Sequence, residues 1–198
     1  MVIPVYFFTG FLESGKTKFI QEMMTDDRFN EGENTLLLVF EEGEEEYKPQ
    51  FFASPNVHIE YVEDIEDIND EVLEVIVKKH SIQRVIVEYN GMYEVSKFFD
   101  IMPSKWVLAQ ALMIADSNTF FNFNANMRQL TFDKMQCSEA VIFNRFDDSK
   151  DKMEFHKTVR AAGRKIDILY EYTDGHVEPD RIPDPLPYDI NADIVEIK

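Results

Sequence analysis

The chain has 198 residues, of which 44% are hydrophobic and 17 are Phe, so it can bury a sizeable core, and disorder of the whole chain is not expected. Its formal net charge of −18 argues against a general surface for nucleic acid or anionic membranes, because polyanions would be repelled. The single Cys137 fits a reducing cytoplasm, and with no long apolar run we expect neither a membrane span nor a signal peptide.

The first motif lies at the start of the chain. An apolar, strand-like run from Pro4 to Thr9 leads into a glycine-rich loop at residues 10–17, and a helix-compatible run from Lys16 to Met24 follows. The loop reads G-F-L-E-S-G-K-T and fits the phosphate-binding pattern G-x-x-x-x-G-K-[ST], in the strand-loop-helix context that this pattern requires. A chance Gly-Lys-Thr turn ahead of a core helix is the alternative.

Each residue type of this loop suits nucleotide binding. Gly10 and Gly15 permit a tight wrap that aims backbone N–H groups at phosphates. Lys16 would bring a positive charge to the β- and γ-phosphates, and the Thr17 hydroxyl can ligate Mg²⁺. The following helix adds the positive end of its dipole. The sequence therefore predicts a nucleotide-binding loop that comprises Gly10, Glu13, Ser14, Gly15, Lys16, Thr17 and Lys18.

A second apolar run, Thr35 to Phe40, is typical of a strand buried on both faces of a parallel sheet. It ends in an acidic run, Glu41 to Glu46. Such a charge run is most often a solvated segment. Its first members nevertheless lie at the carboxyl end of a strand, where open α/β sheets bind ligands, and this position favours a functional role for them.

A second candidate part of a nucleotide site follows. Val57 to Val62 alternates, which predicts a strand near an edge or with one polar face, and Ile68 to Lys79 has helical spacing. The next apolar strand, Arg84 to Glu88, ends in an acid and is soon followed by Gly91. Glu88 could hold Mg²⁺ through a water, and the Gly91 N–H could approach a γ-phosphate. Many strands that bind no metal also end in Glu.

The second half of the chain continues the alternation of strands and helices. We expect helices at residues 93–101, 119–135 and 150–162, and strands at residues 107–115, 139–143 and 165–172. The alternation predicts an α/β fold of the P-loop NTPase type, with a doubly wound, mainly parallel sheet flanked by helices on both faces. Residues 1–175 would form this domain. Residues 176–198 would be a Pro-rich linker, without regular structure from Pro179 onward, and the start of a further domain.

The last motif is Asn144-Arg145-Phe146-Asp147, directly after an apolar strand. GTPases carry an N-K-x-D motif at this place in the order of motifs. The Asp147 carboxylate is suited to accept from guanine N1–H and the exocyclic amine, donors that adenine does not offer in that arrangement. Arg145 replaces the Lys and can still supply a stem and a planar group over the base. The alternative is that Asp147 is the N-cap of the next helix.

Taken together, the motifs resemble the nucleotide-binding domain of the CobW-like GTPases, relatives of the UreG and HypB metallochaperones. The family's G-F-L-G-A-G-K-T, N-E-F-G-E, E-x-x-G, V-D-A-x-x-F and N-K-x-D are matched, in this order, by residues 10–17, 40–44, 88–91, 115–120 and 144–147. The resemblance therefore runs through most of the chain.

The resemblance implies a cytoplasmic, Mg²⁺-dependent GTPase that binds GTP and GDP. No arginine finger can be assigned, so we expect slow turnover without a partner or dimerisation. In the family, the Glu that corresponds to Glu41 lies near the metal and the γ-phosphate, so Glu41 is expected to be catalytic. Lys16 is also expected to be catalytic, because its charge would stabilise the γ-phosphate during the reaction. Mg²⁺ is expected on Thr17, Glu41 and Glu88. A metalloprotein client would be the partner, in metal-cofactor insertion or metal homeostasis. A homodimer is an alternative, because the Phe-rich residues 120–123 could associate with a second copy of the chain.

Departures from the family pattern keep other functions open. Glu13 places an anion in the phosphate loop, as in the similar Glu-Ser-Gly-Lys string of heterotrimeric G-protein α subunits, and Phe40 replaces the family's Asn. No Cys lies between residues 44 and 84, where the family's C-x-C-C motif is expected, so Zn²⁺ or Co²⁺ would lack thiolate ligands. We expect the family's C-terminal domain to begin at the strand-like residues 192–198. The alternatives are a nucleotide-dependent binding module with little or no hydrolysis and an ATP-using P-loop enzyme.

Overall fold

The computed structural model describes residues 2–41 and 43–184, and these residues form one eight-stranded sheet with helices on both sides. The strands are β1 (Ile3–Thr9), β2 (Thr35–Val39), β3 (Val57–Tyr61), β4 (Arg84–Glu88), β5 (Trp106–Asp116), β6 (Ala140–Phe146), β7 (Asp167–Tyr172) and β8 (Val177–Pro179). The α-helices are α1 (Lys16–Thr25), α2 (Asp70–His80), α3 (Val95–Ile101), α4 (Phe120–Asn126), α5 (Arg128–Cys137) and α6 (Lys152–Ala162). The strand order is β3-β2-β4-β1-β5-β6-β7-β8, and every neighbouring pair is parallel except β7 and β8.

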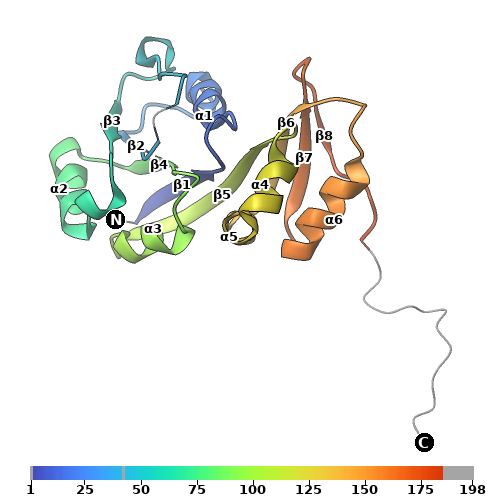
Figure 1. The fold of residues 1–198 in the computed structure, drawn as a ribbon. Coiled ribbons are helices and arrows are strands. Elements are labelled where there is room, and N and C mark those ends of the chain that lie inside the picture. The colour runs from blue at the N-terminus through green and yellow to red at the C-terminus, as the bar shows by residue number, and fades with distance from the viewer. Residues whose placement is uncertain (1, 42, 185–198) are drawn as a thin grey trace, which may run out of the picture.

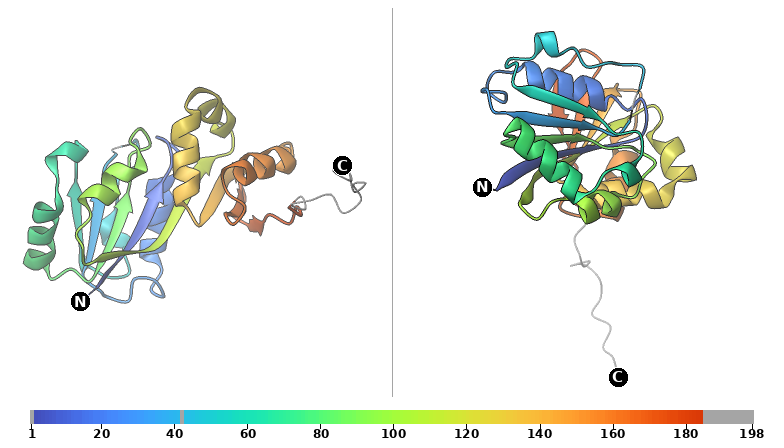
Figure 2. Two further views of the ribbon diagram at one scale, coloured as in Figure 1. Left: turned by 90° about the horizontal axis from the view of Figure 1, so that it is seen from below. Right: turned by 90° about the vertical axis from the view of Figure 1, so that its left-hand side faces the viewer.

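The helices cover the two faces of the sheet unequally (Figures 1 and 2). Residues of α1 pack on one face, against side chains of β2, β5 and β6. On the opposite face, α2 and α3 pack over β1, β2 and β4, and α4, α5 and α6 pack over β5, β6 and β7. This arrangement confirms the predicted α/β fold with a doubly wound, mainly parallel sheet.

The burial of the strands agrees with their sequence patterns. All five residues of β2 are buried. Leu36 lies in the core on one face of the sheet and Leu37 in the core on the other, so a continuous apolar run is needed here. β3, whose sequence alternates, is the edge strand beside β2.

Asparagine and aspartate side chains begin two of the helices. The Asn69 side chain accepts from the backbone N–H of Val72 at 3.0 Å and caps α2. The Asp151 side chain accepts from the N–H of Met153 at 2.9 Å and caps α6. Because α6 begins after Asp151, the alternative interpretation of Asp147 as the N-cap of this helix is wrong.

Two predictions of secondary structure are corrected. The helix expected at residues 119–135 is two helices, α4 and α5, because the backbone leaves the helical conformation at Met127, with φ −131° and ψ 46°. Pro179 lies in regular structure, since it belongs to β8, which pairs with β7. β8 is an edge strand, where a proline without an N–H can be accommodated.

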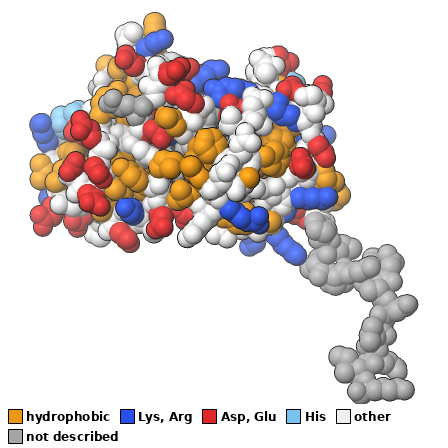
Figure 3. Space-filling view, viewed as in Figure 1, with side chains coloured by type: hydrophobic (Ala, Val, Ile, Leu, Met, Phe, Trp, Pro, Cys, Tyr) orange, Lys and Arg blue, Asp and Glu red, His pale blue; other side chains and the backbone are white. Residues whose placement is uncertain are grey.

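The predicted linker falls only partly within the described residues. The described part includes β8, whereas residues 185–198, with the strand-like run at 192–198, lie outside it. Within the described ranges, no helix is long and apolar enough to cross a membrane. Asp and Glu side chains are spread widely over the face shown in Figure 3, in agreement with the net charge.

Candidate nucleotide-binding site

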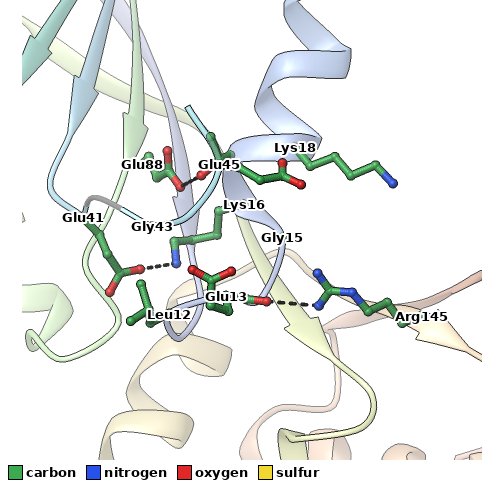
Figure 4. Close-up of a pocket in the computed structure, with 11 residues that line it drawn as sticks. Leu12, Glu13, Gly15, Lys16, Lys18, Glu41, Gly43, Glu45, Glu88 and Arg145 are labelled. Carbon is green, nitrogen blue, oxygen red and sulfur yellow. Dashed lines mark hydrogen bonds and ion pairs between the residues drawn. The ribbon is translucent and has the colours of Figure 1, made fainter. Parts of the chain in front are cut away.

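The residues that the motifs single out meet at one edge of the sheet. The loop after β1, Glu41 after β2 and Glu88 at the end of β4 lie at the carboxyl ends of neighbouring parallel strands, where open α/β sheets bind ligands. Figure 4 shows the pocket that these residues form. It is lined by Leu12, Glu13, Gly15, Lys16, Thr17, Lys18, Glu41, Gly43, Glu45, Glu88 and Arg145.

Gly15 sets the geometry at the start of α1. Its φ of 94° lies in the left-handed region, and a Cβ at this position would lie 2.6 Å from Nδ2 of Asn144. Any other residue would be strained and would collide with the side chain from β6. Gly15 is the N-cap of α1 and has no side chain to bond the first turn. The N–H groups of that turn are therefore left for a bound anion.

Lys16 is buried, and three oxygen atoms hold its ammonium group. Nζ donates to the carbonyl oxygens of Gly10 at 3.0 Å and Phe11 at 2.9 Å. It also pairs with Oε2 of Glu41 at 2.6 Å (Figure 4). The other carboxylate oxygen of Glu41 accepts from the backbone N–H of Gly91 at 3.3 Å. Glu41 thus contacts both groups that the sequence assigns to the γ-phosphate, Lys16 and Gly91.

Thr17 and Glu88 are in direct contact. The Thr17 hydroxyl donates to Oε1 of Glu88 at 2.7 Å, and the Tyr47 hydroxyl donates to Oε2. Burial raises the pKa of Glu88, against the opposing effects of the Tyr47 hydrogen bond and the Lys16 charge. A hydroxyl and a carboxylate are oxygen donors that Mg²⁺ accepts beside phosphates, so these residues fit that ion. Tyr47 is a site residue that the sequence analysis missed, because no local pattern marks its hydroxyl.

Glu13 is accommodated within the phosphate-binding loop, at a φ of 59°. Its Oε1 accepts from the backbone N–H of Glu44 at 3.1 Å. Its carbonyl oxygen accepts from Nη1 of Arg145 at 3.0 Å (Figure 4). The side chain therefore ties the phosphate-binding loop to the acidic loop that follows β2.

A second pocket, of about 200 Å³, adjoins the first and shares Gly15, Lys18 and Arg145 with it. Lys18 forms a long ion pair with Glu22, 3.8 Å between Nζ and Oε1. The lining residues are Gly15, Lys18, Phe19, Glu22, Asn144, Arg145, Glu171, Tyr172, Thr173 and Gly175. The pocket lies between the phosphate-binding loop and the ends of β6 and β7.

Asn144 and Arg145 fasten the phosphate-binding loop to β6. Nδ2 of Asn144 donates to the carbonyl oxygen of Ser14 at 2.6 Å. Nη1 of Arg145 donates to Oδ2 of Asp116 at 2.7 Å, a partner that the sequence analysis did not assign to the site. Two buried oxygens, Ser14 Oγ and Asn144 Oδ1, have no hydrogen-bond partner within the described ranges. Unpaired buried acceptors of this kind fit a site that is completed by a polar ligand.

Asp147 is not among the residues that line these two pockets. Its carboxylate accepts from the backbone N–H of Ser149 at 2.9 Å, and also from the Ser149 hydroxyl and the Lys150 ammonium. The hydrogen bonds from Lys150 and Ser149 lower the pKa of Asp147 to about 2. A guanine contact by Asp147 stays a prediction.

The described side chains include no group of three or more His, Cys, Asp and Glu that could hold a metal ion. The thiol of Cys137 lies in α5, and burial raises its pKa to about 11. The high pKa disfavours the thiolate form that binds metals.

The sequence matches the family model described as CobW/HypB/UreG, nucleotide-binding domain, over residues 4–171. No curated protein matches the chain. Among solved structures, Zn(II)-bound YjiA GTPase from E. coli is 16% identical with a TM-score of 0.59, and the match covers 90% of this chain and 60% of that one. A Zn(II)-bound triple mutant of YjiA GTPase is 14% identical, with a TM-score of 0.62 and the same coverage. Hydrogenase maturation factor HypB from Archaeoglobus fulgidus is 12% identical, with a TM-score of 0.60 and coverage of 87% and 82%. At these low sequence identities, the similarities to the solved structures show the fold alone.

Proposed function

Since the chain belongs to the CobW/HypB/UreG nucleotide-binding domain family, we propose that it binds GTP together with Mg²⁺ and hydrolyses the GTP slowly in the cytoplasm. The observation that carries the proposal is the 2.7 Å contact between Thr17 and Glu88, directly beside the buried ammonium of Lys16. Lys16 and Thr17 at the start of α1, with Glu88 at the end of β4, bring together a cation for the phosphates and oxygen ligands for Mg²⁺. P-loop NTPases need this combination.

In the proposed reaction, a water attacks the γ-phosphorus in line, and the bond from phosphorus to the β–γ bridging oxygen breaks. Lys16, the N–H groups at the start of α1 and the N–H of Gly91 stabilise the negative charge on the phosphate oxygens. Thr17 and Glu88 would hold Mg²⁺, which would supply positive charge against the phosphates. The main contribution of the protein is the placement of these groups before the reaction starts.

GTP binding requires Glu41 to give up its present contacts. A γ-phosphate would compete with the Glu41 carboxylate for Nζ of Lys16 and the N–H of Gly91, and two anions cannot share the same donors without strong repulsion. Once displaced, Glu41 is available for Mg²⁺ or for the attacking water, the roles that the family resemblance implies.

We expect slow turnover because the arginine that lines the pocket, Arg145, is already engaged by Asp116 and by the carbonyl oxygen of Glu13. A partner protein or a second copy of the chain would have to supply an additional cation for fast hydrolysis. In the family context, the partner would be a metalloprotein client, and the purpose would be metal-cofactor insertion or metal homeostasis.

A second candidate function is a nucleotide-dependent binding module that hydrolyses little or no GTP. The contacts of Glu13 with the acidic loop and of Glu41 with Lys16 favour it, because they place two carboxylates in the pocket that the phosphates would enter. Tight GTP binding without phosphate release would support this module over a GTPase. Selective ATP binding would instead support an ATP-using enzyme.

The test is calorimetric titration of GDP, GTP and ATP with Mg²⁺, followed by phosphate release. It compares the wild type with Asp147→Ala and with Asp148→Ala, a matched control at the exposed neighbouring position. We expect guanine nucleotides to bind better than ATP, and only Asp147→Ala to lose this preference. Equal binding of ATP and GTP by the wild type would refute guanine selectivity, and absence of any binding would refute the nucleotide site. Zinc and cobalt titrations with and without GTP test the metal role separately.

A further inference from the structure

Lys134 is a buried cation that joins two loops of the site. Its side chain, in the last turn of α5, is fully buried. Nζ donates to the carbonyl oxygen of Tyr93 at 3.1 Å and lies 5.4 Å from the centroid of the Phe11 ring. Phe11 belongs to the phosphate-binding loop, and Tyr93 follows Gly91 by two residues. One ammonium group thus contacts both loops that would surround a γ-phosphate.

The residue before Lys134 strengthens the same connection. Oδ2 of Asp133 accepts from the backbone N–H of Val95 at 2.7 Å. Val95 is the first residue of α3, whose N-cap, Glu94, makes no side-chain hydrogen bond to the helix. Asp133 therefore satisfies an N–H that the cap leaves open. Two neighbouring side chains of α5 therefore hold the segment Tyr93–Val95: Lys134 bonds its first residue and Asp133 bonds its last.

A single residue, Met92, connects the held segment to Gly91, which lies against the phosphate-binding loop. A Cβ on Gly91 would lie 2.5 Å from Cα of Phe11 and 2.6 Å from the carbonyl oxygen of Gly10, so the two backbones are in close contact. In this position the N–H of Gly91 reaches Glu41, which also binds Lys16. A small displacement of Tyr93 would move the Gly91 N–H away from the phosphate position.

We propose that Lys134 is a positioning residue that holds the segment after β4 against the phosphate-binding loop, so that the Gly91 N–H is placed to bind the γ-phosphate of GTP. The proposal rests on the proposed function, and it assigns to Lys134 the discrimination between nucleoside triphosphate and diphosphate. GDP has no γ-phosphate, so its binding does not depend on Gly91.

A simple role in filling space does not account for the ammonium. Burying a cation is unfavourable unless it is paired or hydrogen-bonded, and an apolar side chain of similar length would fill the same volume. Burial lowers the pKa of Lys134 to about 8, although the nearby Asp133 carboxylate acts in the opposite direction. The hydrogen bond to Tyr93 and the contact with the Phe11 ring are what the charged group adds.

The experiment compares wild type with Lys134→Met, which removes the donor, and with Lys134→Gln, which keeps a donor without the charge. Lys97→Met is the matched control, because Lys97 is exposed and lies over the ring of Tyr93 without bonding its carbonyl oxygen. The affinities for GDP and for a non-hydrolysable GTP analogue are measured by calorimetry with Mg²⁺. Amide hydrogen exchange of the peptide spanning residues 89–95 is measured without nucleotide.

In Lys134→Met we expect the affinity for the GTP analogue to fall about three- to tenfold, as for one lost hydrogen bond, while GDP affinity stays within about twofold. Exchange at residues 89–95 should increase, Lys134→Gln should restore part of both properties, and Lys97→Met should resemble wild type. Equal losses for GDP and the GTP analogue, or unchanged exchange, would overturn the proposal. If wild-type protein bound neither nucleotide, the proposed function would fail, and the exchange result would still decide whether Lys134 holds the segment.

Discussion

Lys16 and Glu41 form a buried ion pair in which Nζ lies 2.6 Å from Oε2, although the two residues are far apart in the sequence. The pair occupies the place where the sequence motif puts the contact between Lys16 and the phosphates. A phosphate bound at this place would therefore replace one anion by another. The affinity for GTP would then reflect the difference between the two interactions.

Glu41→Gln is expected to separate binding from hydrolysis. Without the competing carboxylate, Lys16 is free for a phosphate, so affinity for a non-hydrolysable GTP analogue should rise, by about tenfold for a charged hydrogen bond of about 1.5 kcal/mol. Phosphate release should fall, because the family resemblance places this residue beside the metal and γ-phosphate. Calorimetry and a phosphate assay measure the two effects. Glu45→Gln, in the same loop and pocket, is the control. Weaker binding in Glu41→Gln would contradict the competition.

Thr17→Ala should remove the Mg²⁺-dependent part of nucleotide affinity. The Thr17 hydroxyl is the donor to Glu88 at 2.7 Å and is one of the two groups that fit the ion. In wild type, affinity for GTP should increase when Mg²⁺ is added, and in Thr17→Ala this increase should be at least about tenfold smaller. Titrations with and without Mg²⁺ measure it. Thr25→Ala, at the exposed end of the same helix, should behave as wild type. An unchanged increase in Thr17→Ala would place the ion elsewhere.

Asn144→Ala is expected to destabilise the protein even without nucleotide. The substitution leaves the buried carbonyl oxygen of Ser14 without its donor at 2.6 Å, and loss of one partner of a buried hydrogen bond costs about 1–3 kcal/mol. Urea unfolding monitored by circular dichroism measures the loss. Asn126→Ala removes an amide that is exposed at the end of α4, so it should change the free energy of unfolding by less than about 0.5 kcal/mol. Equal stabilities of the two variants would show that Asn144 does not support the loop.

The lowered pKa of Lys134 predicts a pH-dependent stability. An ordinary lysine has a pKa of 10.5, and burial lowers the pKa of Lys134 to about 8 in the folded chain. Between these values the unfolded chain binds more protons than the folded chain, so the free energy of unfolding rises with pH. Lys134→Met lacks this contribution. The difference in unfolding free energy, wild type minus Lys134→Met, should therefore increase from pH 8 to pH 10, by at most about 1.4 kcal/mol per pH unit. If the free energies of unfolding of the two proteins changed in parallel with pH, the lowered pKa of Lys134 would be contradicted.

The sequence was sufficient for the fold, and it singled out candidate residues that meet at one edge of the sheet, because both follow from local patterns. Continuous apolar runs predict buried parallel strands, and the phosphate-binding loop combines glycine spacing with Lys16 and Thr17. The break at Met127 was not predictable in this way, since residues 119–135 carry no proline or glycine to mark it. The short strand β8 was not predicted either, because Pro179 indicated irregular structure. A proline is tolerated in β8 because this strand lies at the edge of the sheet.

Long-range contacts limited the prediction of the site. Tyr47, Asp116 and Lys134 contact it through groups that the fold brings together from separate elements. No spacing rule relates a tyrosine after an acidic run to Glu88, or a lysine of α5 to the carbonyl oxygen of Tyr93. Such partners follow from the strand order and from side-chain length, and both become visible only in three dimensions.

The position of β1 has a consequence for how the chain is assembled. β1 lies between β4 and β5, its register partners come roughly 80 to 100 residues later in the chain, and Asn144, which fastens the phosphate-binding loop, follows later still. During synthesis β1 must therefore wait, apolar and unpaired, until β4 and β5 have been made, and the phosphate-binding loop must wait until Asn144 has been made. High contact order of this kind slows folding and exposes the nascent chain to aggregation. The loop that defines the chemistry is thus completed only by segments that are made after it.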